Sequence, residues 1–177
     1  MVMGTGRRME TDLMTSGFAP LFPESWRRFE EFSLRSSVAG SIIDRYHDLL
    51  FDPDPAVRFD AAQNWCAWET AIIPTAGPSP RFESQEYRLA FARIVAHYWR
   101  NGSWLSEGQI LRDADRISGI PGVMLQGRVD LSNLSGSCWE LAARWPDCAL
   151  EFFESGHEGN QAMIERLIAV TDAFAAV

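Results

Sequence analysis

Two side chains in the C-terminal third of the sequence could transfer protons as a pair. Asp130 follows a short apolar run at residues 120–127, and His157 follows a second short apolar run at residues 149–153. A carboxylate beside an imidazole fixes the tautomer of the ring and stabilises its protonated form, so that the imidazole can remove a proton from a nucleophile. The simpler alternative is that Asp130 forms a turn or caps a helix, and that His157 is an ordinary loop residue.

The elements that must position this pair are predicted to form a β-α-β-α unit over residues 118–177. Each apolar run lies between turn signals, which is typical of a short strand buried on both faces. A helix capped by Ser135 or Ser137 is expected to run through Arg144 and to separate the two strands. An amphipathic helix at residues 160–175 closes the unit.

Parallel strands in an open α/β sheet bring the loops at their carboxyl ends to one edge. Asp130 and His157 are therefore predicted to lie within hydrogen-bond reach of each other. Their order along the chain, acid before base, is also the order found in α/β-hydrolases, where the nucleophilic serine precedes both.

The preceding part of the chain is predicted to be helical. Residues 1–20 mix glycine, methionine, serine and charges without a period, and are interpreted as a flexible leader. Apolar residues then recur at spacings of three and four, which is typical of amphipathic helices. The predicted helical segments are residues 24–50, divided into two helices near residues 36–40, and residues 56–73 and 83–100.

Several short motifs follow one another in a fixed order. They are Phe22-Pro23-Glu24-Ser25-Trp26, Asp44-Arg45-Tyr46-His47, Ala62-x-x-Trp65-x-x-Trp68-Glu69, Phe91 to Trp99, residues 120–130 ending in Gly127-Arg128-Val129-Asp130, Trp139-Glu140-Leu141, Trp145-Pro146 and Gly156-His157. Together they resemble the motifs of the proline iminopeptidase family, and the resemblance extends from about Phe22 to Phe174.

The resemblance implies a truncated α/β-hydrolase, with a helical cap-like region at residues 21–117 and a C-terminal α/β portion with parallel strands at residues 118–177. It implies that Asp130 and His157 are the acid and the base of the triad. It also implies that Glu69 is a cap carboxylate that helps to hold the free amino terminus of the substrate, a task that suits a buried carboxylate. Without the resemblance, Glu69 would be interpreted as a surface carboxylate on a helix.

The sequence departs from the family pattern at the nucleophile. No G-x-S-x-G elbow and no glycine-rich oxyanion segment is found in the 177 residues. Ser103 has glycine before it but follows a predicted helix instead of a strand, so it is not predicted to be a nucleophile. Further departures are Val95 at the position of a second cap glutamate, Val129 for tyrosine, Asn133-Leu134 for Cys-Pro and Glu158 for serine. These changes weaken the case for prolyl specificity.

The charge and the cysteine content of the chain disfavour several classes of partner and cofactor. The net charge of −8 disfavours nucleic acid and anionic membranes, and a peptide or a small amine-bearing substrate fits better. The three cysteines form no C-x-x-C pair, so neither a disulfide framework nor a zinc site is indicated, and no cofactor is expected. The N-terminus lacks the apolar run of an export signal, and no apolar run is long enough to span a membrane. A cytoplasmic protein is expected.

Three functions are compatible with these observations. The first is a portion of a serine-type peptidase that releases N-terminal proline and that is inactive alone, because the half with the serine is missing. The second is a degenerate hydrolase that acts as a binding or interaction module. The third is a repurposed enzyme in which His157 transfers protons without a covalent intermediate. Two parallel strands leave unpaired edges, so a complementary N-terminal hydrolase half or a homodimer is the expected partner.

Overall fold

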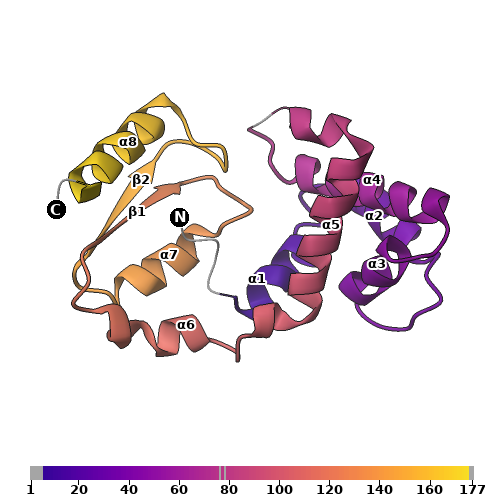
Figure 1. The fold of residues 1–177 in the computed structure, drawn as a ribbon, viewed down its shortest axis with the longest axis horizontal. Helices are drawn as coiled ribbons and strands as arrows, with labels where there is room; N and C mark the ends of the chain where they lie inside the picture. Colours follow the sequence, from indigo (N-terminus) through magenta and orange to yellow (C-terminus); the bar gives the residue numbers. More distant parts are fainter. Residues whose placement is uncertain (1–5, 76, 78, 176–177) are drawn as a thin grey trace. The chain divides into compact units, whose positions relative to one another are not determined.

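The computed structural model describes residues 6–75, 77 and 79–175 and divides them into two compact units (Figure 1). The helical unit comprises residues 11–106, and the sheet unit comprises residues 6–10 and 107–175. The predicted boundary after residue 117 therefore differs from the observed one. Residues 107–117 belong to the sheet unit because Leu111 and Ala114 are buried in its core.

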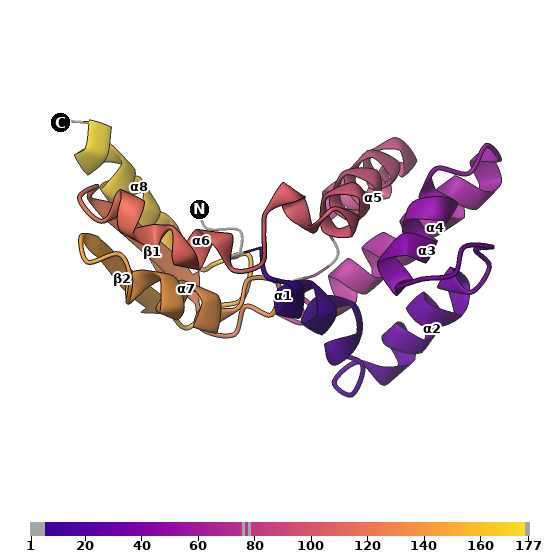
Figure 2. The ribbon, with the colours of Figure 1, turned by 90° about the horizontal axis from the view of Figure 1, so that it is seen from below.

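Four long helices build the helical unit. They are α2 (Pro23–Ser33), α3 (Ile42–Leu50), α4 (Pro55–Ala71) and α5 (Gln85–Arg100), and short 3₁₀ turns at Pro80–Glu83 and Gly102–Trp104 flank α5. Helix α4 packs against α2, α3 and α5 (Figures 1 and 2). These elements confirm the predicted helical pattern, including the break between α2 and α3.

Side-chain caps determine where these helices begin. Ser41 accepts a hydrogen bond from the Asp44 backbone N–H at 3.1 Å, and the Asp44 carboxylate accepts one from the Ser41 N–H in return. Asp54 caps α4 by accepting from the Ala56 N–H at 2.9 Å, and Ser84 caps α5. Such caps satisfy backbone donors that the first turn of a helix leaves unpaired.

An aromatic cluster forms the core of the helical unit. Phe29 stacks on Tyr46 with ring centroids 4.4 Å apart and on Trp68 at 5.4 Å, and Trp65 meets Tyr46 edge to face. The Tyr46 hydroxyl donates to the Phe29 carbonyl oxygen at 2.9 Å, and burial raises the pKa of this phenol. Burial of large aromatic rings, with their polar tips paired, fixes the relative positions of α2, α3 and α4.

The prediction of a flexible leader over residues 1–20 is wrong for the residues that the structure describes. Residues Arg8–Asp12 form helix α1 and Leu13–Gly17 form a π-helical turn, while residues 1–5 lie outside the described part. The carbonyl oxygen of Met14 accepts from the indole of Trp68 at 2.9 Å, and Phe18 is buried. This segment is too short for a helical period of apolar residues to be recognised in the sequence. Its Met14 carbonyl oxygen nevertheless accepts a hydrogen bond from the buried Trp68 indole.

The sheet unit contains two parallel strands. Its elements are α6 (Gln109–Arg112), a 3₁₀ turn (Ala114–Ile117), β1 (Gly122–Gly127), α7 (Ser135–Ala142), β2 (Cys148–Phe153) and α8 (Gln161–Ala175). The register pairs Gly122 with Cys148 and Gly127 with Phe153. Helices α7 and α8 lie on opposite sides of the strands (Figure 1). The predicted β-α-β-α order is confirmed, and the fold is mixed, with many helices and a short parallel sheet.

The predicted capping of α7 by Ser135 or Ser137 is wrong. Helix α7 begins at Ser135 with Leu134 at the cap position and no side-chain cap. Ser137 is buried inside the first turn and donates to the carboxylate of Glu10, a residue close to the N-terminus. The Ser137 hydroxyl therefore binds a residue that is distant in the sequence instead of capping the helix.

The helical unit provides a prediction about pH. The guanidinium of Arg100 lies 2.9 Å from Nδ1 of His47, and burial, Arg100 and His97 lower the pKa of this imidazole against the opposite effects of Asp44 and Asp48. A histidine with a lowered pKa takes up its proton more readily in the unfolded state, so the protein loses stability as pH falls through and below the ordinary histidine range.

We expect the free energy of unfolding to fall between about pH 7.5 and about pH 5, and to fall less steeply in His47→Gln, which cannot take up this proton. Urea denaturation followed by circular dichroism at several pH values measures both slopes. Equal slopes in the two proteins would contradict the prediction.

Candidate active site

Asp130 and His157 lie together at the carboxyl edge of the sheet. Asp130 follows the end of β1, His157 follows the end of β2, and His157 Nδ1 is 3.1 Å from Asp130 Oδ2. The predicted hydrogen-bond contact between the two residues is confirmed. It follows from the parallel pairing of the strands, which places both loops at the same edge.

Backbone contacts hold these two loops together beyond the strands. The Arg128 N–H donates to the Phe153 carbonyl oxygen at 2.8 Å, and the Val129 N–H donates to the Ser155 carbonyl oxygen at 3.2 Å. Gly127 makes this approach possible, because a Cβ atom there would lie 2.4 Å from the carbonyl oxygen of Gly156. The glycine is therefore required by close backbone packing under the site.

The two oxygens of the Asp130 carboxylate have separate partners. Oδ1 accepts from the backbone N–H groups of Ser132 at 2.8 Å and Asn133 at 2.9 Å, while Oδ2 faces His157. The Asp130 side chain is 7% exposed. Asp130 is thus a turn former, as the simpler interpretation held, and at the same time the partner of an imidazole. The turn fixes the carboxylate in the orientation that the contact with His157 needs.

The hydrogen bond to Asp130 selects the tautomer of His157. A carboxylate only accepts, so the ring nitrogen facing it must carry the proton, and Nε2 is left as the basic nitrogen. The Asn133 amide nitrogen lies 3.3 Å from the same Nδ1, but a protonated Nδ1 cannot accept from it. The ionised acceptor makes the stronger bond, so the Asp130 partnership prevails. The His157 side chain is 39% exposed and can reach a bound molecule.

A buried polar group on β1 supports the acid loop. The amide of Gln126 donates to the carbonyl oxygens of Asn133 at 2.8 Å and Gly127 at 3.0 Å, and its own oxygen accepts from the Cys138 thiol at 3.0 Å. Burial raises the pKa of the Cys138 thiol, and nearby Asp130 and Glu10 raise it further, so the thiol stays protonated. Gln126 was not among the predicted site residues, although a glutamine inside an apolar strand is a signal that could have identified it.

Glu69 lies in the helical unit, on α4. Its side chain is buried, and its Oε1 accepts from the Trp65 indole N–H at 3.1 Å. Burial and the charge of Glu69 raise the pKa of the neighbouring Cys66 thiol to about 12. The alternative of a surface carboxylate is wrong, because α4 turns this face toward the aromatic core.

Ser103 has no features of a nucleophile elbow. It lies in the 3₁₀ turn that follows α5, with a φ angle of 53°, and no strand leads into it. A nucleophile elbow is a turn from a strand to a helix, and Ser103 does not lie in such a turn.

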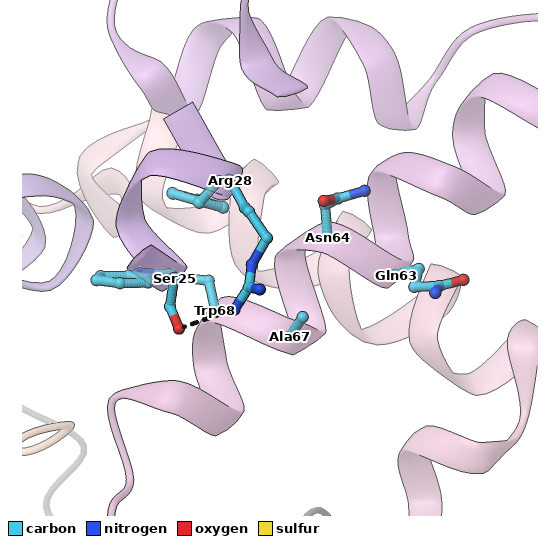
Figure 3. A pocket seen from close by; sticks show the side chains of 7 residues that line it. Ser25, Arg28, Gln63, Asn64, Ala67 and Trp68 are labelled. Carbon is cyan, nitrogen blue, oxygen red and sulfur yellow. Dashed lines mark hydrogen bonds between the residues drawn. The ribbon is translucent and has the colours of Figure 1, made fainter. Parts of the chain in front are cut away.

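A small pocket opens between α2 and α4 (Figure 3). It has a volume of about 160 Å³ and is lined by Ser25, Arg28, Phe29, Gln63, Asn64, Ala67 and Trp68. Arg28 extends along it with its guanidinium 3.4 Å from the Ser25 hydroxyl. None of the residues assigned to the site from the sequence lines this pocket.

Among the described residues, no group of three or more histidine, cysteine or acidic side chains could hold a metal ion. Within the same residues, every helix is too short or too polar to cross a membrane.

Comparison with known proteins relates this geometry to curated relatives. None of the protein-family models matches the chain. A probable proline iminopeptidase of Streptomyces coelicolor is 40% identical over 98% of this chain and 55% of its own length. Proline iminopeptidases of Xylella fastidiosa (strain Temecula1) and Arabidopsis thaliana are 34% and 31% identical over 95% and 94% of this chain. The chain spans about half the length of these relatives, and it matches their C-terminal part.

The close packing at Gly127 leads to a test of the site. We expect Gly127→Ala to destabilise the protein by about 1–3 kcal/mol, because the added methyl group must displace the backbone of the His157 loop. The same substitution at Gly136, on α7, meets no atom within 4 Å and is expected to be neutral or slightly stabilising. Thermal unfolding compares the two variants. NMR detection of the His157 Nδ1 proton shows whether the contact with Asp130 survives, and equal behaviour of both variants would exclude the packing role.

Proposed function

Since the chain belongs to the proline iminopeptidase family, we propose that it is the portion of a proline iminopeptidase-like serine hydrolase that supplies the acid, the base and a substrate-holding carboxylate. The observation that carries this proposal is the contact between Asp130 Oδ2 and His157 Nδ1 at 3.1 Å. It is the contact that a triad requires of these positions. The finer fold assignment, a truncated α/β-hydrolase with a helical cap-like region, is part of the same proposal.

The proposed chemistry is acyl transfer through a serine. His157 Nε2 accepts the proton of the serine hydroxyl while the serine oxygen attacks the carbonyl carbon of an N-terminal proline residue. Asp130 stabilises the imidazolium ion that results. The imidazolium then donates the proton to the amine that leaves, and a water molecule repeats the sequence to release free proline. Asp130 and His157 need only the orientation described above for these steps.

The serine and the oxyanion donors must come from elsewhere. The 177 residues contain no G-x-S-x-G elbow, and the relatives are about twice as long as the matched region. We assign both groups to a polypeptide that corresponds to the remaining part of these relatives. Alone, the chain has a base but no nucleophile to activate, so it is proposed to be inactive.

Glu69 is proposed to hold the positively charged amino terminus of the substrate. Its carboxylate is buried and oriented by the Trp65 indole, so its negative charge is weakly screened. A buried carboxylate facing a secondary ammonium favours a free amino terminus over a blocked one. Val95, on α5, provides no second charge for this purpose.

A binding module is the second candidate. The absence of a serine elbow from this sequence favours it, because a hydrolase remnant without a nucleophile can still bind a peptide. In that case the contact between Asp130 and His157 is retained for folding alone. For either function we propose a cytoplasmic location, where the thiols of Cys66, Cys138 and Cys148 stay reduced.

The test is a single polypeptide in which the leading part of the Streptomyces coelicolor relative, ahead of its matched region, is joined to this chain. We expect the fusion to hydrolyse proline 4-nitroanilide and His157→Ala to lower its kcat by roughly a thousandfold or more. Glu165→Ala, at an exposed position of α8, is the control and should retain the activity. The 177-residue chain alone should give no turnover above its own His157→Ala variant. A folded fusion without turnover would contradict the proposed function.

The role of Glu69 has a separate signature in the same fusion. We expect Glu69→Gln to raise KM by about 10- to 100-fold with a smaller effect on kcat, because a charge-assisted contact to the ammonium is lost. Glu86→Gln, on the exposed start of α5, is the matched control and should leave KM unchanged. An equal KM in Glu69→Gln and Glu86→Gln would remove Glu69 from the binding site.

A further inference from the structure

The imidazole of His157 has two side-chain neighbours at the same ring nitrogen. Nδ1 lies 3.1 Å from Asp130 Oδ2 and 3.3 Å from the amide nitrogen of Asn133. Asp130 requires Nδ1 to carry a proton, because a carboxylate only accepts hydrogen bonds. The amide nitrogen of Asn133 is also a donor, so in this orientation two N–H groups face each other. The Asn133 amide is therefore mismatched to the tautomer that Asp130 requires.

The backbone of Asn133 is fixed on both sides, whereas its side-chain amide can rotate. The Asn133 N–H donates to Asp130 Oδ1 at 2.9 Å, and the Asn133 carbonyl oxygen accepts from the Gln126 amide at 2.8 Å. These two bonds fix the point from which the side chain reaches the imidazole. Rotation about the Cβ–Cγ bond, a broad two-fold torsion, exchanges the amide oxygen and nitrogen with little movement of other atoms. Among the described residues, Asn133 Oδ1 has no hydrogen-bond partner that this rotation would remove.

We propose that Asn133 is a positioning residue for His157, and that its amide oxygen accepts the Nδ1 proton together with Asp130 Oδ2. The contact is a three-centre hydrogen bond, in which one N–H is shared between two acceptors. The carboxylate is the stronger acceptor because it is ionised, and the amide oxygen adds a second acceptor to the same proton. Rotation of the amide thus replaces a contact between two donors by a contact between a donor and an acceptor.

A second acceptor restricts the rotation of the imidazole ring more than Asp130 does by itself. The restriction matters because the His157 side chain is 39% exposed and lies in a loop. With the ring held by two groups at Nδ1, Nε2 keeps the direction in which it accepts a proton. The positive charge that His157 acquires during acyl transfer makes Nδ1–H a stronger donor, so both acceptors stabilise the imidazolium ion. This consequence for catalysis rests on the proposed function, whereas the hydrogen bond itself does not.

NMR of the 177-residue chain tests the shared proton. Asn133→Asp keeps an oxygen at the amide position and removes the donors, whereas Asn133→Ala removes the acceptor. We expect the Nδ1 proton of His157 to exchange with water about 2- to 10-fold faster in Asn133→Ala, the size of effect of one neutral hydrogen bond, and no faster in Asn133→Asp. The nitrogen-15 chemical shifts of the imidazole identify the tautomer independently and should show a protonated Nδ1 in the unsubstituted chain.

Asn101→Asp and Asn101→Ala, at an exposed position after α5, are the matched controls and should leave the His157 signals unchanged. Equal exchange in Asn133→Ala and the unsubstituted chain would overturn the proposal, and so would exchange in Asn133→Asp that is as fast as in Asn133→Ala. One further measurement needs no variant. A strong nuclear Overhauser contact between the Nδ1 proton and the Asn133 amide protons would show that the nitrogen faces the ring, and it would overturn the proposal as well.

The effect on catalysis is measured in the fusion described above. We expect Asn133→Ala to lower kcat by about 2- to 10-fold and Asn133→Asp to retain most of it, because the acceptor is present again. An unchanged kcat in Asn133→Ala would overturn the positioning role. A fusion without turnover would leave the hydrogen bond seen by NMR standing and would count against the proposed function alone.

Discussion

The parallel pairing of β1 with β2 is the interaction on which the rest of the site depends. It sets the register from Gly122 to Gly127, and this register brings the loops of Asp130 and His157 to one edge. Backbone bonds beyond the strands continue the pairing, and Gly127 permits the close approach that they need. The 3.1 Å contact between Asp130 and His157 therefore follows mainly from the geometry of the backbone.

Buried polar groups then convert this geometry into a defined orientation. Gln126 holds the acid loop through the carbonyl oxygen of Asn133, and the Asn133 N–H in turn fixes one oxygen of Asp130. Each of these groups is paired, which is the condition under which buried polar groups stabilise a fold instead of weakening it. The second oxygen of the Asp130 carboxylate, Oδ2, therefore faces His157. A network of this kind explains how a loop can hold a carboxylate side chain that is only 7% exposed.

The sequence predicted the elements whose signals are local. Apolar periodicity identified the helices, and turn signals identified both strands, so the approach of Asp130 to His157 could be predicted. The errors concern groups with distant partners. Ser137 looks like a cap because its local sequence fits one, but it binds Glu10. The helical turn near Met14 supplies an acceptor to the indole of Trp68, which is distant in the sequence. No local pattern encodes either partnership, and the same holds for the support that Gln126 gives to the acid loop.

The two units differ in how their hydrophobic cores are built. The helical unit closes on itself, since rings from three helices stack in its centre and Trp65, Tyr46 and Phe29 are almost completely buried. The described part of the sheet unit buries smaller apolar side chains, among them Leu111, Ala114, Met124, Cys138 and Leu141, and no residue of α8 is buried. Burial of apolar area is the main favourable term in folding, so the smaller core of the sheet unit contributes less of it. The same unit holds Asp130 and His157, whose relative position therefore depends on the backbone pairing of β1 with β2 more than on a large buried core.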